Sequence, residues 1–295
     1  TRMLSFIAGK FDMTYPTDIS PALHREIMTQ APATQCVMRR TNVSTNLVIN
    51  RDIPPFDNAD VRRALGLALD RAAFNRIINE SEARIGAAML PPPEGSWGVP
   101  DEMLRTFLGY GPDIEKNREE ARAIMRKLGY GPDKMLQTKI FTRDINNFRD
   151  PALILNDQLK TIFINGELEV VDTPVYYSRV FKKDFSIGLN LTGSSLDDPD
   201  QNFYENYGCG SPRNFTQYCN KDIEALFDKQ SAETDPAVRR KLVWEIDKKL
   251  QEDLARPIIY HDKSASCWQP TLHGFTTMEN SVYNYPRLEN AWLDR

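Results

Sequence analysis

The stretch "NRDIPPFDNADVRRALGLALDRAAF", residues 50–74, marks the point at which an extended segment gives way to a helix. Residues 36–50, just before it, are rich in Val, Leu, Ile and Thr, a composition typical of a strand. Proline lacks the backbone N–H that a continuing strand ladder needs, so Pro54 and Pro55 are expected to end this strand. We therefore expect a strand that is followed at once by a helix.

The helix in this stretch has a polar start and an amphipathic pattern. Asn58 or Asp60 is suited to cap it, because a short polar side chain can accept the first free backbone N–H groups. Apolar residues then recur every three or four positions from Val61 to Ile77, which predicts a single helix with one buried stripe. Its opposite face is expected to carry four charged residues, Arg62, Arg63, Asp70 and Arg71.

Strands and helices alternate in the sequence that follows. The apolar spacing, the caps and the turn residues predict these elements in order: a helix from Asp113 to Gly129, a strand near residues 139–141, a helix opened by Asp150 and Pro151, the strand "GELEVVD", a helix opened by Thr173 and Pro174, and an alternating strand over residues 185–191. This order predicts an α/β domain over roughly residues 45–255, with strands joined by crossover helices.

Two long segments interrupt this alternation. Residues 86–112 are rich in Pro and Gly, carry Trp97 and are expected to form a long surface loop. The loop after residue 191 leads into a short helix around Ile223 and then into a longer helix opened by Asp235 and Pro236. The longer helix is expected to turn a charged face to solvent, with Arg239, Arg240, Glu245, Asp247, Lys248 and Glu252.

The chain becomes extended again from Pro257 onward. Two extended segments that bracket an α/β domain suggest a pair of crossover strands that join it to a second lobe. Residues 1–40 and 270–295 would then be pieces of that lobe. The first residue is Thr rather than Met, and the opening residues read like the interior of a domain, so we expect a fragment of a longer chain.

Composition and motifs exclude several classes of protein. The formal net charge of −4 argues against nucleic acid or an anionic membrane as a partner. The longest apolar runs have four residues, 87–90 and 152–155, far below the roughly 20 that a membrane-spanning helix requires. His24, His261 and His273 lack metal-ligand spacing, so no metal site is expected. A P-loop, G-x-G-x-x-G and G-x-S-x-G are all missing, and no cofactor is expected.

Three aspartates, Asp197, Asp198 and Asp200, follow the last predicted strand of the domain. A pair of carboxylates on a loop can perform acid–base chemistry. Asp-Asp-Pro-Asp is also ordinary turn and helix-cap chemistry, which is the more common use of such residues. We therefore favour the cap and keep the carboxylate pair as the alternative.

The four cysteines allow two disulfides. Cys209 and Cys219 lie ten residues apart in a loop rich in Gly, Pro and Asn, where a disulfide and a pair of free thiols are equally compatible with the sequence. Export to an oxidising compartment favours the disulfide. Cys36 and Cys267 lie on the two proposed crossover strands, so they can approach each other.

Several aromatic residues lie outside the apolar stripes of the predicted helices. Such side chains commonly line ligand clefts, and they also pack beneath loops. The sequence leaves both roles open for Trp97, Trp268, Tyr204, Tyr207 and Tyr218.

Five blocks of the sequence together resemble one known family. "NRDIPPFDNADVRRALGLALDRAAF" is similar to the entry into the large carboxy-terminal lobe of the extracellular solute-binding proteins of family 5, the receptors of ABC importers for peptides, nickel, opines and oligosaccharides. Four further blocks resemble later parts of that lobe in the same order: "NREEARAIMRKLGY", "DQLKTIFINGELEVV", "DDPDQNFY" and "YCNKDIEALFDKQSAETDPAVRRKLVWEIDKKLQEDLARPIIYH".

The resemblance implies a periplasmic-binding-protein-like α/β fold, with two lobes that close over a solute. Residues 45–256 would be the carboxy-terminal lobe, residues 1–44 part of the amino-terminal lobe, and residues 257–295 the return crossover with a remaining piece of that lobe. It also implies a monomeric, non-catalytic receptor in the periplasm. Such a receptor delivers a peptide-like or other small polar solute to the permease of an ABC importer, without a metal or cofactor.

The resemblance carries over to the ligand site only in part. In peptide-binding members the cleft loop presents an Asp to the amino terminus of the peptide, whereas the matching position here is Ser194 or Ser195. Hydroxyl groups would suit a sugar, a polyol or a modified peptide as well. The predicted ligand-binding residues are Thr192, Ser194, Ser195, Asp197, Tyr207, Trp97 and Asn46. An α/β hydrolase or glycosidase that uses Asp197 and Asp198 is the alternative function.

Overall fold

The computed structural model describes residues 2–15, 18–278 and 287–294. Its centre is a mixed sheet in the order β3-β2-β4-β1-β5. The strands are β1 (Gln35–Ile49), β2 (Leu136–Arg143), β3 (Ile164–Val171), β4 (Ile187–Thr192) and β5 (Ile258–Trp268). A small second sheet pairs β6 (Leu272–His273) with β7 (Trp292–Leu293).

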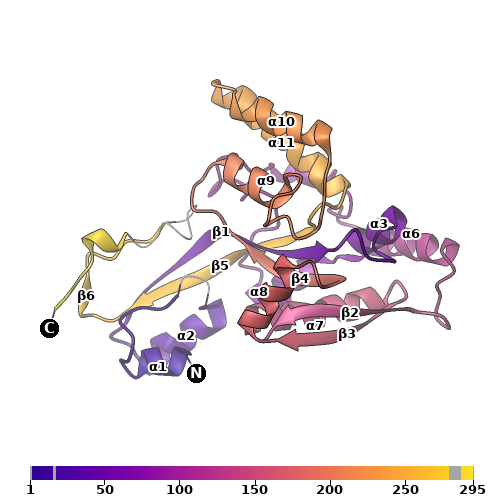
Figure 1. Cartoon of the computed structure of the whole chain (residues 1–295). Coiled ribbons are helices and arrows are strands. Elements are labelled where there is room, and N and C mark those ends of the chain that lie inside the picture. The colour runs from indigo at the N-terminus through magenta and orange to yellow at the C-terminus, as the bar shows by residue number, and fades with distance from the viewer. Residues whose placement is uncertain (1, 16–17, 279–286, 295) are drawn as a thin grey trace.

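The long strands β1 and β5 are paired, as the sequence predicts for two crossover strands. They run antiparallel from the pair Gln35–Trp268 to the pair Asn46–Ile258, with register shifts on the way. The other end of β1 pairs with β4, and β2 joins the sheet by parallel pairing with β4 and β3. One end of β1 therefore lies inside the α/β sheet while the other end leaves it together with β5 (Figure 1).

Two short helices pack where β1 and β5 leave the sheet. They are α1 (Arg2–Ile7) and α2 (Pro21–Gln30), and Figure 1 shows them beside these strand ends. Phe6, Ile27, Ala265 and Cys267 form a small apolar cluster there. This cluster is separate from the main core of the α/β domain, so α1, α2 and the ends of β1 and β5 share a packing unit of their own.

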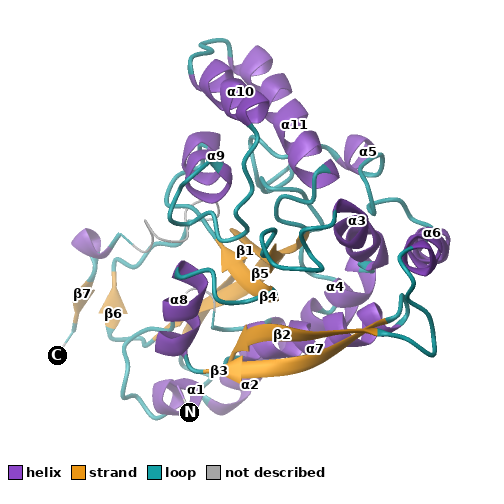
Figure 2. Ribbon diagram, turned by 45° about the vertical axis from the view of Figure 1, so that its right-hand side comes forward, coloured by secondary structure: helices purple, strands orange, loops and turns teal. Residues whose placement is uncertain are grey.

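The remaining helices surround the sheet. Their bounds are α3 (Ala59–Ala68), α4 (Arg71–Asn79), α5 (Asp101–Leu104), α6 (Ile114–Lys127), α7 (Asn146–Lys160), α8 (Thr173–Phe181), α9 (Pro199–Tyr207), α10 (Lys221–Ser231) and α11 (Pro236–Glu252). Figure 2 shows α7 along β2 and β3, with α9, α10 and α11 grouped on the opposite side of the molecule. The predicted alternation of strands and helices is confirmed.

The predicted helix over residues 61–77 is wrong in one respect, because the chain breaks there into α3 and α4. Leu69 adopts an extended conformation, and the Asp70 side chain caps α4 by accepting a hydrogen bond from Ala73 N. Two arginines expected on the exposed face are buried instead. Arg62 donates to the carbonyls of Phe56 and Asp57. Arg71 donates to two carbonyls of other segments, those of Ile258 and Gly109.

Two further predictions of local structure are wrong. The helix expected to open at Asp150 and Pro151 begins earlier, at Asn146, and Pro151 lies inside α7. Residues 86–112 are not a surface loop, because Ala87, Val99 and Phe107 are buried and the segment includes α5. The apolar residues of this segment follow neither a helical nor a strand period. The sequence therefore did not indicate that the segment packs against the rest of the chain.

The loop after β4 contains a helix that the sequence did not predict. Asp198 caps α9 by accepting a hydrogen bond from Asp200 N at 3.0 Å, in agreement with the cap interpretation of these aspartates. Both pairs of cysteines form disulfides, Cys36 with Cys267 and Cys209 with Cys219. The first of these joins the two crossover strands directly.

The two disulfides close loops of very different length, which predicts different contributions to stability. Cys36 and Cys267 are 231 residues apart, whereas Cys209 and Cys219 are only 10 apart. On the chain-entropy model, replacing the first pair by Ala lowers the free energy of unfolding by about 2–3 kcal/mol more than replacing the second pair. Urea unfolding of the two double variants under oxidising conditions measures this difference. Equal losses would contradict it.

Candidate functional site

The loop between β4 and α9, residues 193–198, is called the cleft loop below. It is held to the crossover strand β1 by Asn42, whose Nδ2 donates to the Ser194 carbonyl at 3.1 Å and to Ser194 Oγ at 2.9 Å. It is held to α9 by the backbone N–H of Ser195, which donates to Gln201 Oε1 at 2.8 Å. The loop is therefore anchored at both of its serines.

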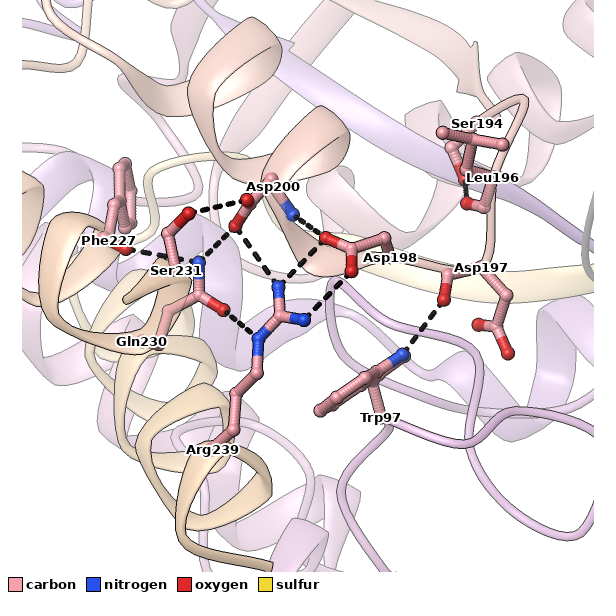
Figure 3. Close-up of polar contacts among 10 residues, drawn as sticks. All are labelled: Trp97, Ser194, Leu196, Asp197, Asp198, Asp200, Phe227, Gln230, Ser231 and Arg239. Atoms are coloured by element: carbon pink, nitrogen blue, oxygen red, sulfur yellow. Dashed lines mark hydrogen bonds and ion pairs between the residues drawn. The ribbon is translucent and has the colours of Figure 1, made fainter. Parts of the chain in front are cut away.

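Trp97 meets the cleft loop across about a hundred residues of sequence. Its Nε1 donates to the Asp197 carbonyl at 2.9 Å. Trp244 on α11 donates from Nε1 to the carbonyls of Trp97 and Gly98 and so fixes the backbone on the other side. Figure 3 shows the Asp197 carboxylate turned away from the polar network that Asp198 joins. Two of the predicted residues, Trp97 and Asp197, are thus in direct contact.

Thr192, at the end of β4, is the centre of a polar cluster under the start of the cleft loop. Its hydroxyl lies 3.0 Å from Asn46 Nδ2, 3.1 Å from Asn190 Nδ2 and 3.0 Å from Arg256 Nη1. Asn46 is buried between the strands and also donates to the Ser44 carbonyl. These contacts bring together two more of the predicted residues, Thr192 and Asn46.

Arg256 is a buried cation that the sequence analysis did not single out. Its guanidinium is fully buried and donates to Thr192 Oγ1, to Asn206 Oδ1 and to the Arg213 carbonyl. In the described part of the chain no carboxylate pairs with it. Burial therefore lowers the pKa of Arg256. The ring of Tyr207, another predicted residue, lies 5.8 Å from this guanidinium and packs in an apolar cluster.

A cavity of about 310 Å³ lies between the amino-terminal segment and the α/β domain. The amino-terminal segment and β1 contribute Arg2, Tyr15, Asp18 and Val43 to its wall, and the domain contributes Arg143, Ile145, Asn147, Phe148, Tyr177 and Leu191. The sequence analysis predicted none of these ten residues. They come from distant parts of the chain, and no motif joins them.

The cavity wall contains two arginines and one aspartate. Arg2 and Asp18 form an ion pair at 3.0 Å. Arg143 instead donates to Thr173 Oγ1 at 2.9 Å, and its guanidinium lies 4.5 Å from the Phe148 ring centre. It has no carboxylate partner within the described ranges of the chain. The cavity thus offers one positive group that is not neutralised by the protein.

Asp198, one of the two carboxylates proposed for acid–base chemistry, is held in an ion pair. Arg239 Nη1 and Nη2 donate to the two oxygens of Asp198, each at 2.9 Å. Burial opposes ionisation of Asp198, but the hydrogen bonds from Arg239 and from Asp200 N outweigh it and lower its pKa. A carboxylate held as an anion by a bidentate guanidinium is a poor proton donor. The arrangement therefore gives no support to the enzyme alternative.

A second buried charge, Asp247, was predicted to face solvent on α11 and does not. Its Oδ1 accepts from Ala88 N at 2.7 Å and its Oδ2 accepts from Met89 N at 3.3 Å. The side chain is fully buried, and this burial raises the pKa of Asp247 to about 7. It fastens the segment that leads to Trp97, so α11 holds this segment at two places.

The described residues contain no group of three or more His, Cys, Asp or Glu side chains that could hold a metal ion. Among the same residues, no helix is long and apolar enough to cross a membrane.

Comparison with known proteins gives consistent matches. A sequence model of the bacterial extracellular solute-binding proteins, family 5 Middle, matches residues 1–214. Di/tripeptide-binding protein 2 of Pseudomonas aeruginosa is 21% identical, covering 88% of this chain and 48% of that protein. The probable D,D-dipeptide-binding periplasmic protein DdpA of Escherichia coli is 25% identical, covering 84% and 45%. The chain spans about half the length of the curated relatives it matches.

Solved structures agree with the observed fold. The OppA complex of Haemophilus influenzae with the peptide RPPGFSPFR has a TM-score of 0.85 at 18% identity and covers 99% of this chain and 56% of its own. DppA of Helicobacter pylori in complex with the peptide STSA has a TM-score of 0.78 at 19% identity, with coverages of 100% and 55%. These likenesses confirm the predicted periplasmic-binding-protein-like α/β fold.

The buried carboxylate of Asp247 predicts a pH dependence of stability. Burial raises the pKa of Asp247 from its ordinary value of 3.8, which applies in the unfolded chain, to about 7 in the folded chain. Between these two pH values the folded state holds a proton that the unfolded state lacks. Stability is therefore expected to fall as pH rises from about 4 to 7, by roughly 4 kcal/mol from this group. Burial raises the pKa of Asp262 to about 7 as well, which adds a slope of the same sign.

The variant Asp247→Asn should have a flatter profile of unfolding free energy against pH than the wild type. Urea unfolding at pH 5 and at pH 8 gives the two points needed. Asp262→Asn, on β5, serves as the comparison variant. It should flatten the same profile independently of Asp247, because the pKa of Asp262 is also raised. An Asp247→Asn profile parallel to the wild type would show that Asp247 is ionised in the folded protein throughout.

Proposed function

The chain belongs to the bacterial extracellular solute-binding proteins of family 5, and on this premise we propose that it is the solute-binding part of a receptor for an ABC importer. The receptor binds a peptide-like or other small polar solute in the periplasm as a monomer and delivers it to the membrane permease. It performs no catalysis. Di/tripeptide and D,D-dipeptide binding by the relatives named above supports a peptide-like solute.

The cavity between the amino-terminal segment and the α/β domain carries this proposal. Its wall is shared by Tyr15 and Asp18 on one side and by Arg143 and Tyr177 on the other. A solute in it would touch both bodies at once, which is what a receptor that closes on its ligand requires. We propose the lobe boundaries at residues 1–44, 45–256 and 257–295 accordingly, with β1 and β5 as the connections that bend.

The chemistry of the cavity suits a peptide-like solute. Among the described residues no carboxylate pairs with Arg143, and a guanidinium binds a carboxylate with two parallel hydrogen bonds. Tyr15, Phe148 and Tyr177 supply aromatic surface for an apolar group. A terminal carboxylate at Arg143 is therefore the anchor we propose.

None of the residues predicted from the sequence lines this cavity, but Leu191 of its wall adjoins Thr192, so we propose that the predicted residues form a neighbouring part of the solute site. We propose that Thr192, Ser194, Ser195, Asp197 and Trp97 contact the solute from the cleft loop, since all but Ser194 are partly exposed. Asn46 and Tyr207 are fully buried, so we propose that they act by supporting Thr192 and Arg256.

Removal of the Arg143 charge should weaken binding of peptides that end in a free carboxylate. A charge-assisted hydrogen bond is worth about 1.5–3 kcal/mol, so Arg143→Gln should raise Kd about 10- to 100-fold. Isothermal titration of the purified protein with di- and tripeptides measures this change. Peptide amides should bind the wild type as weakly as the free peptides bind the variant.

Arg149→Gln is the matched control, because Arg149 lies on α7, six residues beyond Arg143, and pairs with Asp144 outside the cavity wall. Its Kd should equal that of the wild type. Native mass spectrometry of the purified protein should also reveal a co-purified solute. Failure of every peptide and sugar in the panel to bind the wild type would refute the receptor function.

A further inference from the structure

Arg239, near the start of α11, makes polar contacts with three side chains close to the end of the cleft loop. Besides its two bonds to Asp198, its Nη2 donates to Asp200 Oδ1 at 3.3 Å and its Nε donates to Gln230 Oε1 at 3.1 Å. Figure 3 shows the guanidinium between the first residues of α9 and Gln230 of α10. The arginine thus ties α9, α10 and α11 together at the point where the cleft loop ends.

The same guanidinium supports Trp97. Its carbon lies 4.8 Å from the centre of the Trp97 ring, within the range of a cation–π contact. Trp97 in turn donates to the Asp197 carbonyl, and Arg240, the next residue on α11, donates to the Ser96 carbonyl at 2.9 Å. Arg239 therefore reaches the cleft loop by two routes, through Asp198 at its end and through Trp97 at Asp197.

The guanidinium itself does not reach the cavity. The residues of the cavity wall come from other elements, and the Arg239 side chain is 15% exposed. An effect of Arg239 on solute binding must act through the position of the loop. A loop that is held in its binding conformation before the solute arrives binds more tightly, because less order has to be created on binding.

We propose that Arg239 is a positioning residue of the solute site, which holds the cleft loop in its binding conformation through Asp198 and Trp97. The proposal rests on the proposed function, because it assumes that the cleft loop contacts the solute. Arg239 needs its planar fork for this role. A lysine keeps the charge but cannot bridge Asp198, Asp200 and Gln230 while it lies on the Trp97 ring.

A double-mutant cycle tests the coupling. Arg239→Lys and Trp97→Phe should each weaken binding of the tightest peptide in the panel about tenfold, since each loosens the same loop. The double variant should be weakened by about the same factor and not by their product, because the second change removes support that is already lost. Isothermal titration well below the unfolding temperature of every variant gives the ratio of each variant's Kd to that of the wild type.

Amide hydrogen exchange provides a measurement that does not need a solute. In ligand-free Arg239→Lys, the amides of residues 195–198 should exchange at least several-fold faster than in the wild type, while those of β1 and β5 are unchanged. A uniform rise in exchange over the whole domain would show that Arg239 only stabilises the fold, and would overturn the proposal.

Arg179→Lys is the matched control variant. Arg179 also holds a carboxylate with two hydrogen bonds, to Glu169, and lies on an aromatic ring, that of Phe141. Its loss should leave Kd and cleft-loop exchange unchanged. Wild-type Kd values in Arg239→Lys, or multiplicative losses in the cycle, would overturn this proposal while the receptor function stands. A wild type that binds no solute would overturn both.

Discussion

The double pairing of β1 is the constraint on which the rest of the structure depends. Residues Ser44–Ile49 of this strand pair with β4, and its earlier residues pair with β5. Leu47 and Ile49 on one face of β1 pack in the main core, and Val48 on the other face packs in a second apolar cluster. The strand is therefore covered on both faces, and even its polar residues Thr45 and Asn46 are buried. Buried polar groups need partners, and Asn46 finds them in the Ser44 carbonyl and Thr192. The polar cluster beneath the cleft loop follows from this burial.

Buried charges then fasten segments that the sheet does not hold. Arg71 binds the carbonyls of Gly109 and Ile258, Asp247 binds the amides of Ala88 and Met89, and Arg256 binds the Arg213 carbonyl. Apart from Ile258, the first residue of β5, the bound backbone atoms belong to loops that have no regular hydrogen-bonding pattern of their own. Removing such a charge from water is costly, and the backbone partners offset part of the cost while they fix the loop.

The sequence predicts local structure well where a single local signal, such as a helix cap, decides the conformation. The start of α6 at Asp113, its end before Gly129 and the paired crossover strands were all predicted and are confirmed. It fails where a polar residue has a tertiary partner, because Arg71 and Asp247 lie at helical positions that read as exposed. Only the fold brings the partner backbone of residues 88, 89 and 109 to them. The cavity wall is missed for the same reason, since Asp18 and Arg143 share no motif and meet only in space.

The cleft loop is attached to two different parts of the fold, the crossover strand β1 and, through Trp97, the helix α11. On one side Asn42 holds Ser194, and Asn42 lies on β1 within a register shift between Arg40 and Ser44. On the other side Trp97 holds Asp197 and is itself fixed to α11. Bending of the crossover at this shift, as proposed above, would pull on Ser194, while α11 keeps Asp197 in place. The geometry of the loop is therefore tied to the angle between the crossover strand and the α/β domain.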